Sequence, residues 1–147
     1  DRDMPAALNK QHIEVLKDER TRLEIRGAGL ELAGIRYWTR RTADIAKLLR
    51  KATDTVVLLA HDPRRLPDAA ALDVPAVLSG HTHGGQVSVP GIGPVIWRKR
   101  FPIVQGVGEQ DNTAIFVSRG VGTVYVPVRI NCPPEVALVT LKRRSQI

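Results

Sequence analysis

The chain has 147 residues, of which 43% are hydrophobic and 25% are charged, and its formal net charge is +7. These proportions are typical of a globular protein, and the length fits one domain, which we assign to residues 1–147. The longest apolar runs are far shorter than the about 20 residues of a membrane-spanning helix. The only cysteine, Cys132, excludes an internal disulfide, and we expect it to be a packed structural thiol.

The positive charge is spread along the chain in small clusters rather than collected in one segment. A positive field attracts anionic substrates, nucleic acid or acidic lipid headgroups. The chain lacks the interleaved aromatic residues of a platform that binds single-stranded nucleic acid, so we expect no specific nucleic-acid partner. Trp97 beside the basic residues 98–100 resembles a surface that meets a phospholipid headgroup, which leaves membrane-surface association open. The clusters are at residues 40–41, 64–65, 98–100 and 142–144.

Helix and strand patterns alternate in the first half of the chain. Residues 8–20 show a weak amphipathic helical pattern. Residues 21–26 and 30–35 alternate as strands on either side of a glycine-rich turn, which predicts a β-hairpin. Residues 42–52 read as a helix, with Thr42 as its N-cap and Ile45, Leu48 and Leu49 on one face.

The second half of the chain contains more strand-like segments than helical ones. Two apolar strands are expected, each followed by a histidine-containing loop, and two further strands near the C-terminal end. The pattern indicates an α/β architecture built around one sheet. The segments are a strand at 55–60, a short helix at 67–72, a strand at 74–79, a turn or lid-like loop at 87–94, a strand at 114–118, an irregular stretch at 120–134 and a strand at 135–141.

The most informative run is GHTHGGQ at residues 80–86, directly after the second apolar strand. Its two histidines, His81 and His83, stand one residue apart, and His61 ends the preceding apolar strand. Histidine pairs also arise by chance in turns, but α/β proteins place ligand sites just past strand ends, which favours a metal site here. Neutral imidazole binds zinc, iron, nickel, copper and manganese, so the spacing names neither the metal nor the reaction.

Four segments occur in a recognisable order: LAHDP at 59–63, LSGHTHGGQ at 78–86, VSRGVG at 117–122 and RINCPPEV at 129–136. Together they closely resemble the calcineurin-like metallophosphoesterases, in particular the bacterial branch with a GHTHGGQ element, over roughly residues 20–142. This resemblance implies a four-layer α/β/β/α sandwich that carries two metal ions on loops at strand ends.

The same resemblance assigns roles to individual residues. His61 and His81 would share one divalent ion and His83 would hold the second, with manganese, iron or zinc as the metals. Two such ions with a metal-bound hydroxide suit the hydrolysis of phosphate monoesters or diesters. Weaker substrate-contacting or positioning roles are expected for a set that comprises Gly84, Gly85, Gln86, Arg119 and Asn131.

The chain departs from the family pattern in its first part. The family's D-x-H, G-D-x-x-D and G-N-H-D motifs, which supply the remaining ligands, are not present. We therefore expect a C-terminal half that needs a missing N-terminal half and has little activity alone. Tyr37 and Trp38 also stand where relatives tend to be acidic and polar, which could alter the rim around the substrate.

Two other functions remain open at this level. The chain could be a non-catalytic module that binds metal or phosphate, or a basic protein that binds nucleic acid or a membrane surface. The expected location is cytoplasmic or membrane-associated.

Overall fold

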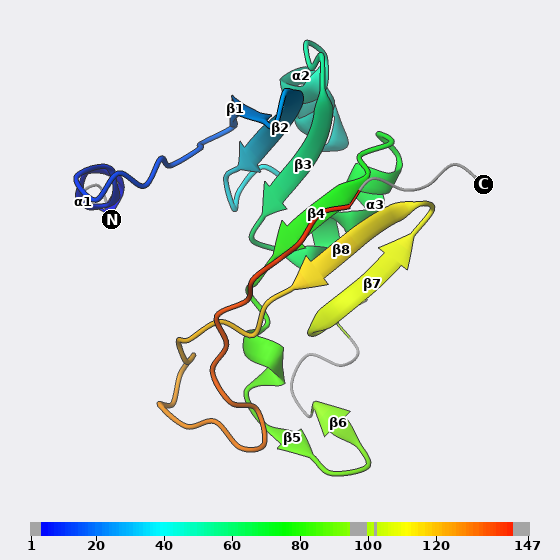
Figure 1. Cartoon of the computed structure of the whole chain (residues 1–147). Helices are drawn as coiled ribbons and strands as arrows, with labels where there is room; N and C mark the ends of the chain where they lie inside the picture. Colours follow the sequence, from blue (N-terminus) through cyan, green and yellow to red (C-terminus); the bar gives the residue numbers. More distant parts are fainter. Residues whose placement is uncertain (1–3, 95–99, 102, 143–147) are drawn as a thin grey trace.

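The sheet at the centre of the molecule has six strands in the spatial order β1-β2-β3-β4-β8-β7 (Figure 1). The structure is a computed structural model that describes residues 4–94, 100–101 and 103–142. Four inner strands run parallel to one another, and the edge strands β1 and β7 pair antiparallel with their neighbours. The strands are β1 (Glu19–Ile25), β2 (Ala28–Ile35), β3 (Thr55–Ala60), β4 (Ala76–Ser79), β7 (Gly106–Gln110) and β8 (Thr113–Val117).

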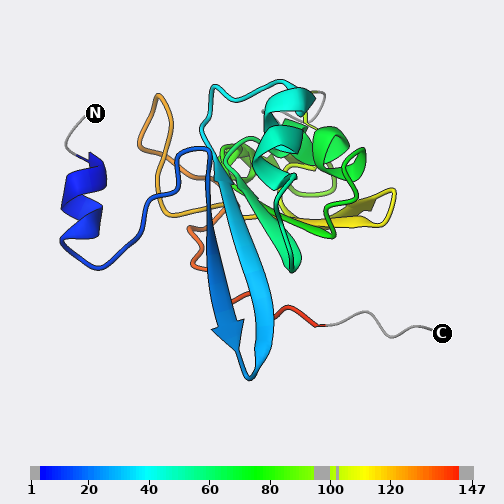
Figure 2. The ribbon, with the colours of Figure 1, turned by 90° about the horizontal axis from the view of Figure 1, so that it is seen from above.

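Two helices, α2 (Thr42–Leu49) and α3 (Leu66–Ala70), cover one face of this sheet (Figure 2). Ile45 of α2 and Leu66 of α3 are fully buried against Leu58 of β3, at the centre of the core. The 3-10 helix η1 (Pro63–Arg65) connects β3 to α3. The predicted apolar face of α2 is confirmed, because Leu48 and Leu49 pack beside Ile45 on the core.

The described residues therefore form a β layer with an α layer on one side. This confirms a mixed α/β fold, whereas the four-layer sandwich is not formed by the part of the chain that the structure describes. The other face of the sheet is only half-buried at Leu59, Leu78 and Phe116. In the described segments no helix is long and apolar enough to cross a membrane.

The hairpin between β1 and β2 follows the predicted pattern. Its turn consists of Arg26 and Gly27, both with positive φ (53° and 78°), which is the geometry of a tight type I′ hairpin turn. A second turn of this kind, Asp111 and Asn112 (φ 48° and 66°), joins β7 to β8. Strand β7 was not predicted, although this Asp-Asn pair before a β-branched run was a usable hairpin signal.

The helix predicted over residues 8–20 is wrong in its extent. Helix α1 spans Met4–Asn9 without a buried residue and stands apart from the sheet (Figures 1 and 2). The chain then leaves helical geometry, with φ of 59° at His12. A tertiary contact decides this: the Asp18 carboxylate accepts bonds from the backbone N–H of Arg36 (3.0 Å) and from Thr39 (2.7 Å). The approach to β1 is thus held by β2 and its loop.

The predicted N-cap role of Thr42 is also wrong. Arg41 occupies the cap position, and no side chain caps the helix there. The Thr42 hydroxyl instead donates to the Asp68 carboxylate at 2.5 Å, which ties α2 to α3. The Thr42 hydroxyl therefore bonds to a residue distant in the sequence and does not cap its own helix.

The strand predicted at 135–141 does not form, although its residues are mostly apolar. Val136 and Leu138 are 90% and 97% exposed. The segment crosses the half-buried face of the sheet in front of β4 and β8 (Figure 1). Those strands already have neighbours on both sides, so they have no free edge for it to pair with. With Leu59, Leu78 and Phe116 it lines an open groove of about 480 Å³.

Two short strands lie in the segment predicted as a turn or lid-like loop. Strands β5 (Ser88–Val89) and β6 (Gly93–Pro94) form a small separate hairpin below the main sheet (Figure 1). The turn is confirmed by this hairpin, and a lid function stays a prediction.

Candidate metal centre

The two predicted strand-end histidines lie together at the carboxyl ends of β3 and β4. These strands are parallel neighbours, so the residues that follow them meet at the same edge of the sheet. His61 follows β3 directly, and the N–H of Gly80 after β4 donates to its carbonyl at 3.1 Å. This contact brings His81 alongside, with its Nδ1 3.2 Å from Nε2 of His61.

This nitrogen separation fits a pair of ligands on one metal ion. Two imidazole nitrogens that each bind one ion at about 2.1 Å, with an angle of about 90° to 110° between them, lie about 3.0 to 3.4 Å apart. Without an ion, a hydrogen bond between the two rings holds these nitrogens at the same separation. The donor set and its spacing therefore suit a borderline divalent cation such as zinc or iron.

The electrostatics of the pair favour the metal-binding protonation state. Burial lowers the pKa of His61, and the charge of His81 lowers it further. Burial also lowers the pKa of His81, with Arg64 acting in the same direction and Asp62 opposing it. Both rings are therefore held neutral near pH 7, which is the form that binds metals.

His83 lies on the same loop but does not join the pair. It begins the short helix η2 (His83–Gly85), and its Nδ1 lies 3.1 Å from the carbonyl of Gly122. Since only an N–H can bond to a carbonyl, this contact leaves Nε2 of His83 as the nitrogen able to bind an ion.

The histidines are not supplemented by a carboxylate in the described structure. The nearest acidic residue, Asp62, accepts from the backbone N–H of Arg64 at 3.0 Å and is paired with the Arg64 guanidinium. Among residues 4–94, 100–101 and 103–142, no group of three or more histidine, cysteine or acidic side chains is placed to hold a metal.

The GHTHGGQ loop has an unusual backbone. His81, His83 and Gln86 have φ of 68°, 51° and 57°, a region that side chains with a Cβ seldom occupy. Thr82, which is fully buried, accepts from the N–H of Gly84 and donates to the carbonyl of Val104 at 2.6 Å. Such strain persists only when surrounding contacts hold it, and it is common at functional sites.

Gly84 is the most tightly packed point of this loop. A Cβ built there would lie 2.6 Å from Cγ of Arg119 and 2.7 Å from Sγ of Cys132. Cys132 is buried, and its thiol donates to the carbonyl of His83 at 3.3 Å. The prediction of a packed structural thiol is thereby confirmed.

Arg129 holds the loop together and was not recognised from the sequence. Its guanidinium donates to five backbone carbonyl groups, which belong to His83, Arg119, Gly120, Gly122 and Cys132. The carbonyl of Gly122 is shared, since it accepts from Arg129 at 2.6 Å and faces His83 at 3.1 Å. Arg129 thus fixes the group that orients His83. The run of glycines at 120 and 122 before an arginine was its only local signal.

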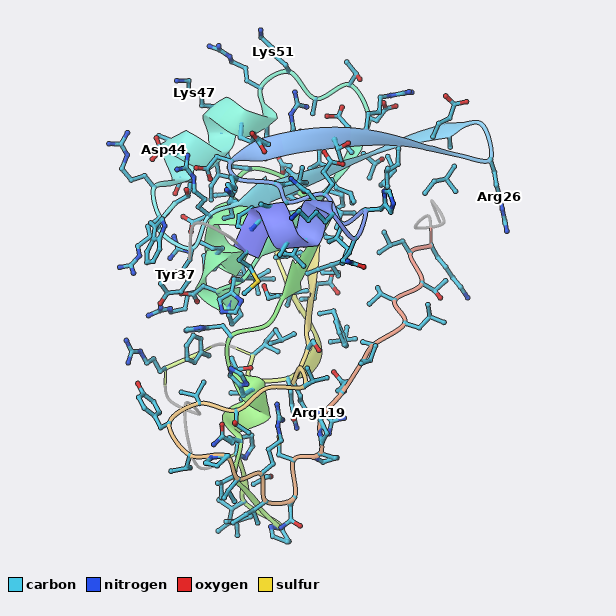
Figure 3. All side chains as sticks on the ribbon, turned by 90° about the vertical axis from the view of Figure 1, so that its left-hand side faces the viewer. Arg26, Tyr37, Asp44, Lys47, Lys51 and Arg119 are labelled. Atoms are coloured by element: carbon cyan, nitrogen blue, oxygen red, sulfur yellow. The ribbon has the colours of Figure 1, made fainter. Side chains whose placement is uncertain are left out.

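The five residues with weaker predicted roles have these contacts. The Gly84 and Gly85 amides donate to the side chain and the carbonyl of Thr82, respectively. The Gln86 side chain donates to the carbonyls of Val124 and Val126 and accepts from the N–H of Val124, while its backbone N–H donates to the carbonyl of His83 at 3.0 Å. Arg119, beside η2 in Figure 3, pairs with Glu135 at 2.7 Å, and Asn131 donates to the carbonyl of Ser88. Their roles toward substrate stay predictions.

Aromatic rings surround the His61–His81 pair. The ring centroid of Tyr37 lies 5.9 Å from that of His61 and 5.5 Å from that of His81. The ring centroid of Phe101, which is 5% exposed, also lies 5.5 Å from that of His81. Trp38 meets Tyr37 at 5.3 Å with the rings nearly perpendicular, at 86°.

Several of the basic clusters are neutralised locally. Arg41 pairs with Asp44, Arg64 with Asp62, and Arg65 with Asp68. The surface proposed around Trp97 and residues 98–99 lies outside the described residues, as do residues 143 and 144.

Comparison with known proteins confirms the resemblance to the calcineurin-like metallophosphoesterases. The chain is 32% identical over 119 residues to the uncharacterized metallophosphoesterase YkuE of Bacillus subtilis (strain 168), covering 79% of this chain and 42% of the relative. An uncharacterized metallophosphoesterase of Aquifex aeolicus (strain VF5) is 43% identical over 91 residues, 61% of this chain and 34% of the relative. The phosphodiesterase YaeI of Escherichia coli (strain K12) is 36% identical over 88 residues, 58% of this chain and 32% of the relative.

The chain spans less than half the length of these curated relatives. No family model and no solved structure matches the chain.

Proposed function

This chain is a relative of the calcineurin-like metallophosphoesterases, and on that premise we propose that it supplies histidine ligands to a metal-dependent phosphoesterase site. The observation that carries the proposal is the His61–His81 pair, whose facing nitrogens are 3.2 Å apart at the ends of two parallel strands. The substrate is a phosphate monoester or diester.

Each histidine has a defined task in this proposal. His61 and His81 hold one divalent ion, and His83 holds a second one through Nε2, because its Nδ1 faces the carbonyl of Gly122. A pair of divalent ions supplies an activated water nucleophile and stabilises the charge that develops on the phosphoryl oxygens. Arg129 keeps His83 in place through the Gly122 carbonyl.

The described residues supply too few ligands for two ions, since a functional dinuclear site also needs carboxylates. We propose that these come from outside the 147 residues, from an N-terminal half of the same domain. The length of the matched relatives supports this, because the chain covers at most 42% of the three named above. The 147 residues alone should then bind metal more weakly than a complete site and hydrolyse little substrate.

Metal binding by the chain tests the proposal directly. Titration with Mn²⁺ or Zn²⁺, followed by calorimetry or by competition with a chromogenic chelator, should show binding that His81→Ala reduces at least about tenfold. His12→Ala is the matched control, since His12 is the exposed fourth histidine and lies outside the site. Equal binding by the wild type and His81→Ala would refute the assignment. Robust hydrolysis of a bis-aryl phosphate by the 147 residues would refute the need for a second half.

The two other functions give different results in the same experiments. A non-catalytic module would bind metal through His81 yet give no hydrolysis even when joined to the missing ligands. A basic nucleic-acid or membrane-surface binder would show salt-dependent binding to DNA or anionic vesicles that survives loss of all three histidines. The local pairing of Arg41, Arg64 and Arg65 with acidic neighbours weakens that last alternative.

A further inference from the structure

Two aromatic residues at the rim of the metal centre are not needed for the chemistry described above. Tyr37 and Trp38 follow β2, the neighbour of β3 on the far side from β4, so they reach the same sheet edge as His61. Tyr37 contacts both histidine rings, whereas Trp38 extends outward from it. Figure 3 shows Tyr37 on the side of the molecule where these loops gather.

We propose that Tyr37 and Trp38 form an aromatic wall that selects phosphate esters carrying an aromatic ring. The proposal rests on the phosphoesterase function proposed above and names the substrate class of that site. The ring of the ester would pack on the exposed Trp38 while its phosphate reaches the His61–His81 pair.

The exposure of Trp38 is the first argument. Its side chain is 75% exposed, although an indole is among the largest apolar side chains and gains most from burial. Tyr37 is only half-buried and fixes Trp38 through an edge contact at 5.3 Å and 86°. The two rings form a corner, so one flat ring can stack on Trp38 while its edge meets Tyr37.

The distance from this corner to the histidines is the second argument. Tyr37 lies 5.5 Å from His81 and 5.9 Å from His61 by ring centroids. Trp38 packs on Tyr37 at 5.3 Å. The corner is therefore next to the histidine pair, so an ester whose phosphate binds there has its organic group beside these rings.

The charges around the aromatic rings are the third argument. The guanidinium carbon of Arg40 lies 5.7 Å from the Tyr37 ring centroid. A cation stacked on this ring places positive charge near the histidine pair, where it attracts a phosphate. Aromatic surface and positive charge therefore occur together at this one edge.

An aromatic ester should bind about three- to tenfold more tightly than a saturated one of the same size, from ring stacking beyond simple area burial. We would measure phenyl phosphate against cyclohexyl phosphate by calorimetry with the Mn²⁺-loaded chain. Adenosine 5′-monophosphate against ribose 5-phosphate then distinguishes a nucleobase from a simple aryl group. Each probe carries the same phosphate, so only the ring differs.

Variants assign the preference to the wall. Trp38→Leu should remove most of the preference for phenyl over cyclohexyl phosphate while cyclohexyl phosphate still binds, and Tyr37→Leu should weaken it further. Tyr125→Leu is the matched control, because Tyr125 is 95% exposed and is the only other tyrosine. The control should keep the full preference.

The outcomes separate the two proposals. Equal affinity of the wild type for phenyl and cyclohexyl phosphate, or a preference that persists in Trp38→Leu, overturns the aromatic wall and leaves the phosphoesterase site standing. Failure of every phosphate to bind also overturns the aromatic wall, whereas metal binding that His81→Ala leaves unchanged overturns the phosphoesterase site.

Discussion

Gly84 offers the sharpest test of the loop geometry, because two separate penalties meet there. Its φ is +63°, and a Cβ would lie within 2.9 Å of side-chain atoms of Arg119, Cys132 and Gln105. Placing a residue with a Cβ in this backbone region costs about 1 to 2 kcal/mol. Forcing a methyl group into a filled space costs about 1 to 3 kcal/mol more.

The free energy of unfolding of Gly84→Ala should therefore fall by about 2 to 5 kcal/mol. At about 3 °C for each kcal/mol in a domain of this size, the Tm should fall by about 6 to 15 °C. Because Cys132 must also move, its thiol should react faster with a disulfide reagent than in the wild type, in which it is 2% exposed. The chain has no second cysteine to confuse that measurement.

Two other glycines separate the penalties. Gly91 has φ +77° with nothing within 4 Å of a Cβ, so Gly91→Ala should show the backbone cost alone. Gly80 has no positive φ, and its Cβ would meet only Nδ1 of His61 at 3.9 Å, so Gly80→Ala should be nearly neutral. If Gly84→Ala lost no more stability than Gly91→Ala and kept an unreactive thiol, the packing against Arg119 and Cys132 would be wrong.

Two further predictions concern residues that organise the structure. In Arg129→Lys the free energy of unfolding should fall by about 2 kcal/mol or more, because an ammonium cannot reach the five carbonyls that the guanidinium binds. The variant should also bind metal more weakly, because His83 loses its support. Denaturant unfolding and a metal titration measure the two effects, and an unchanged metal affinity would contradict the role of Arg129. Glu31, which is buried, accepts from the N–H of Thr53 at 2.7 Å and pairs with Arg20, so Glu31→Gln should lose about 1.5 to 3 kcal/mol at pH 7. The hydrogen bond from Thr53 helps to hold the pKa of Glu31 below 4.5, so its contribution is complete above that pH and disappears as the pH falls through the folded pKa. The stability curves of the wild type and Glu31→Gln should accordingly converge in acid, and parallel curves would disprove the assignment.

Several parts of the fold were predictable because their cause is local. The β1–β2 hairpin needs a residue pair that accepts positive φ, and Gly27 provides one. The apolar run at β3 forms an inner parallel strand whose residues 56–58 and 60 are buried, and such a strand appears in the sequence as a continuous hydrophobic segment. Helix α2 shows its buried face through the spacing of Ile45, Leu48 and Leu49.

Other parts were mispredicted because a distant partner decides them. The apolar run at residues 135–141 is typical of a strand, but the inner strands already have neighbours on both sides. Thr42 has the chemistry of an N-cap, yet Asp68 takes its hydroxyl. The helix around residues 8–20 stops early because no core lies beneath it and Asp18 is held by β2 and its loop.

The candidate site shows the same division. By itself the sequence determined that His61, His81 and His83 follow apolar strands, since residue types and spacings are local properties. Only the tertiary structure decided that β3 and β4 are parallel neighbours, that His61 and His81 therefore face each other, and that His83 turns to Gly122 instead. Tyr37 and Arg129 likewise reach the site from segments far away in the chain. Strand order and loop packing depend on contacts between distant residues, and those contacts leave no periodic trace in the sequence.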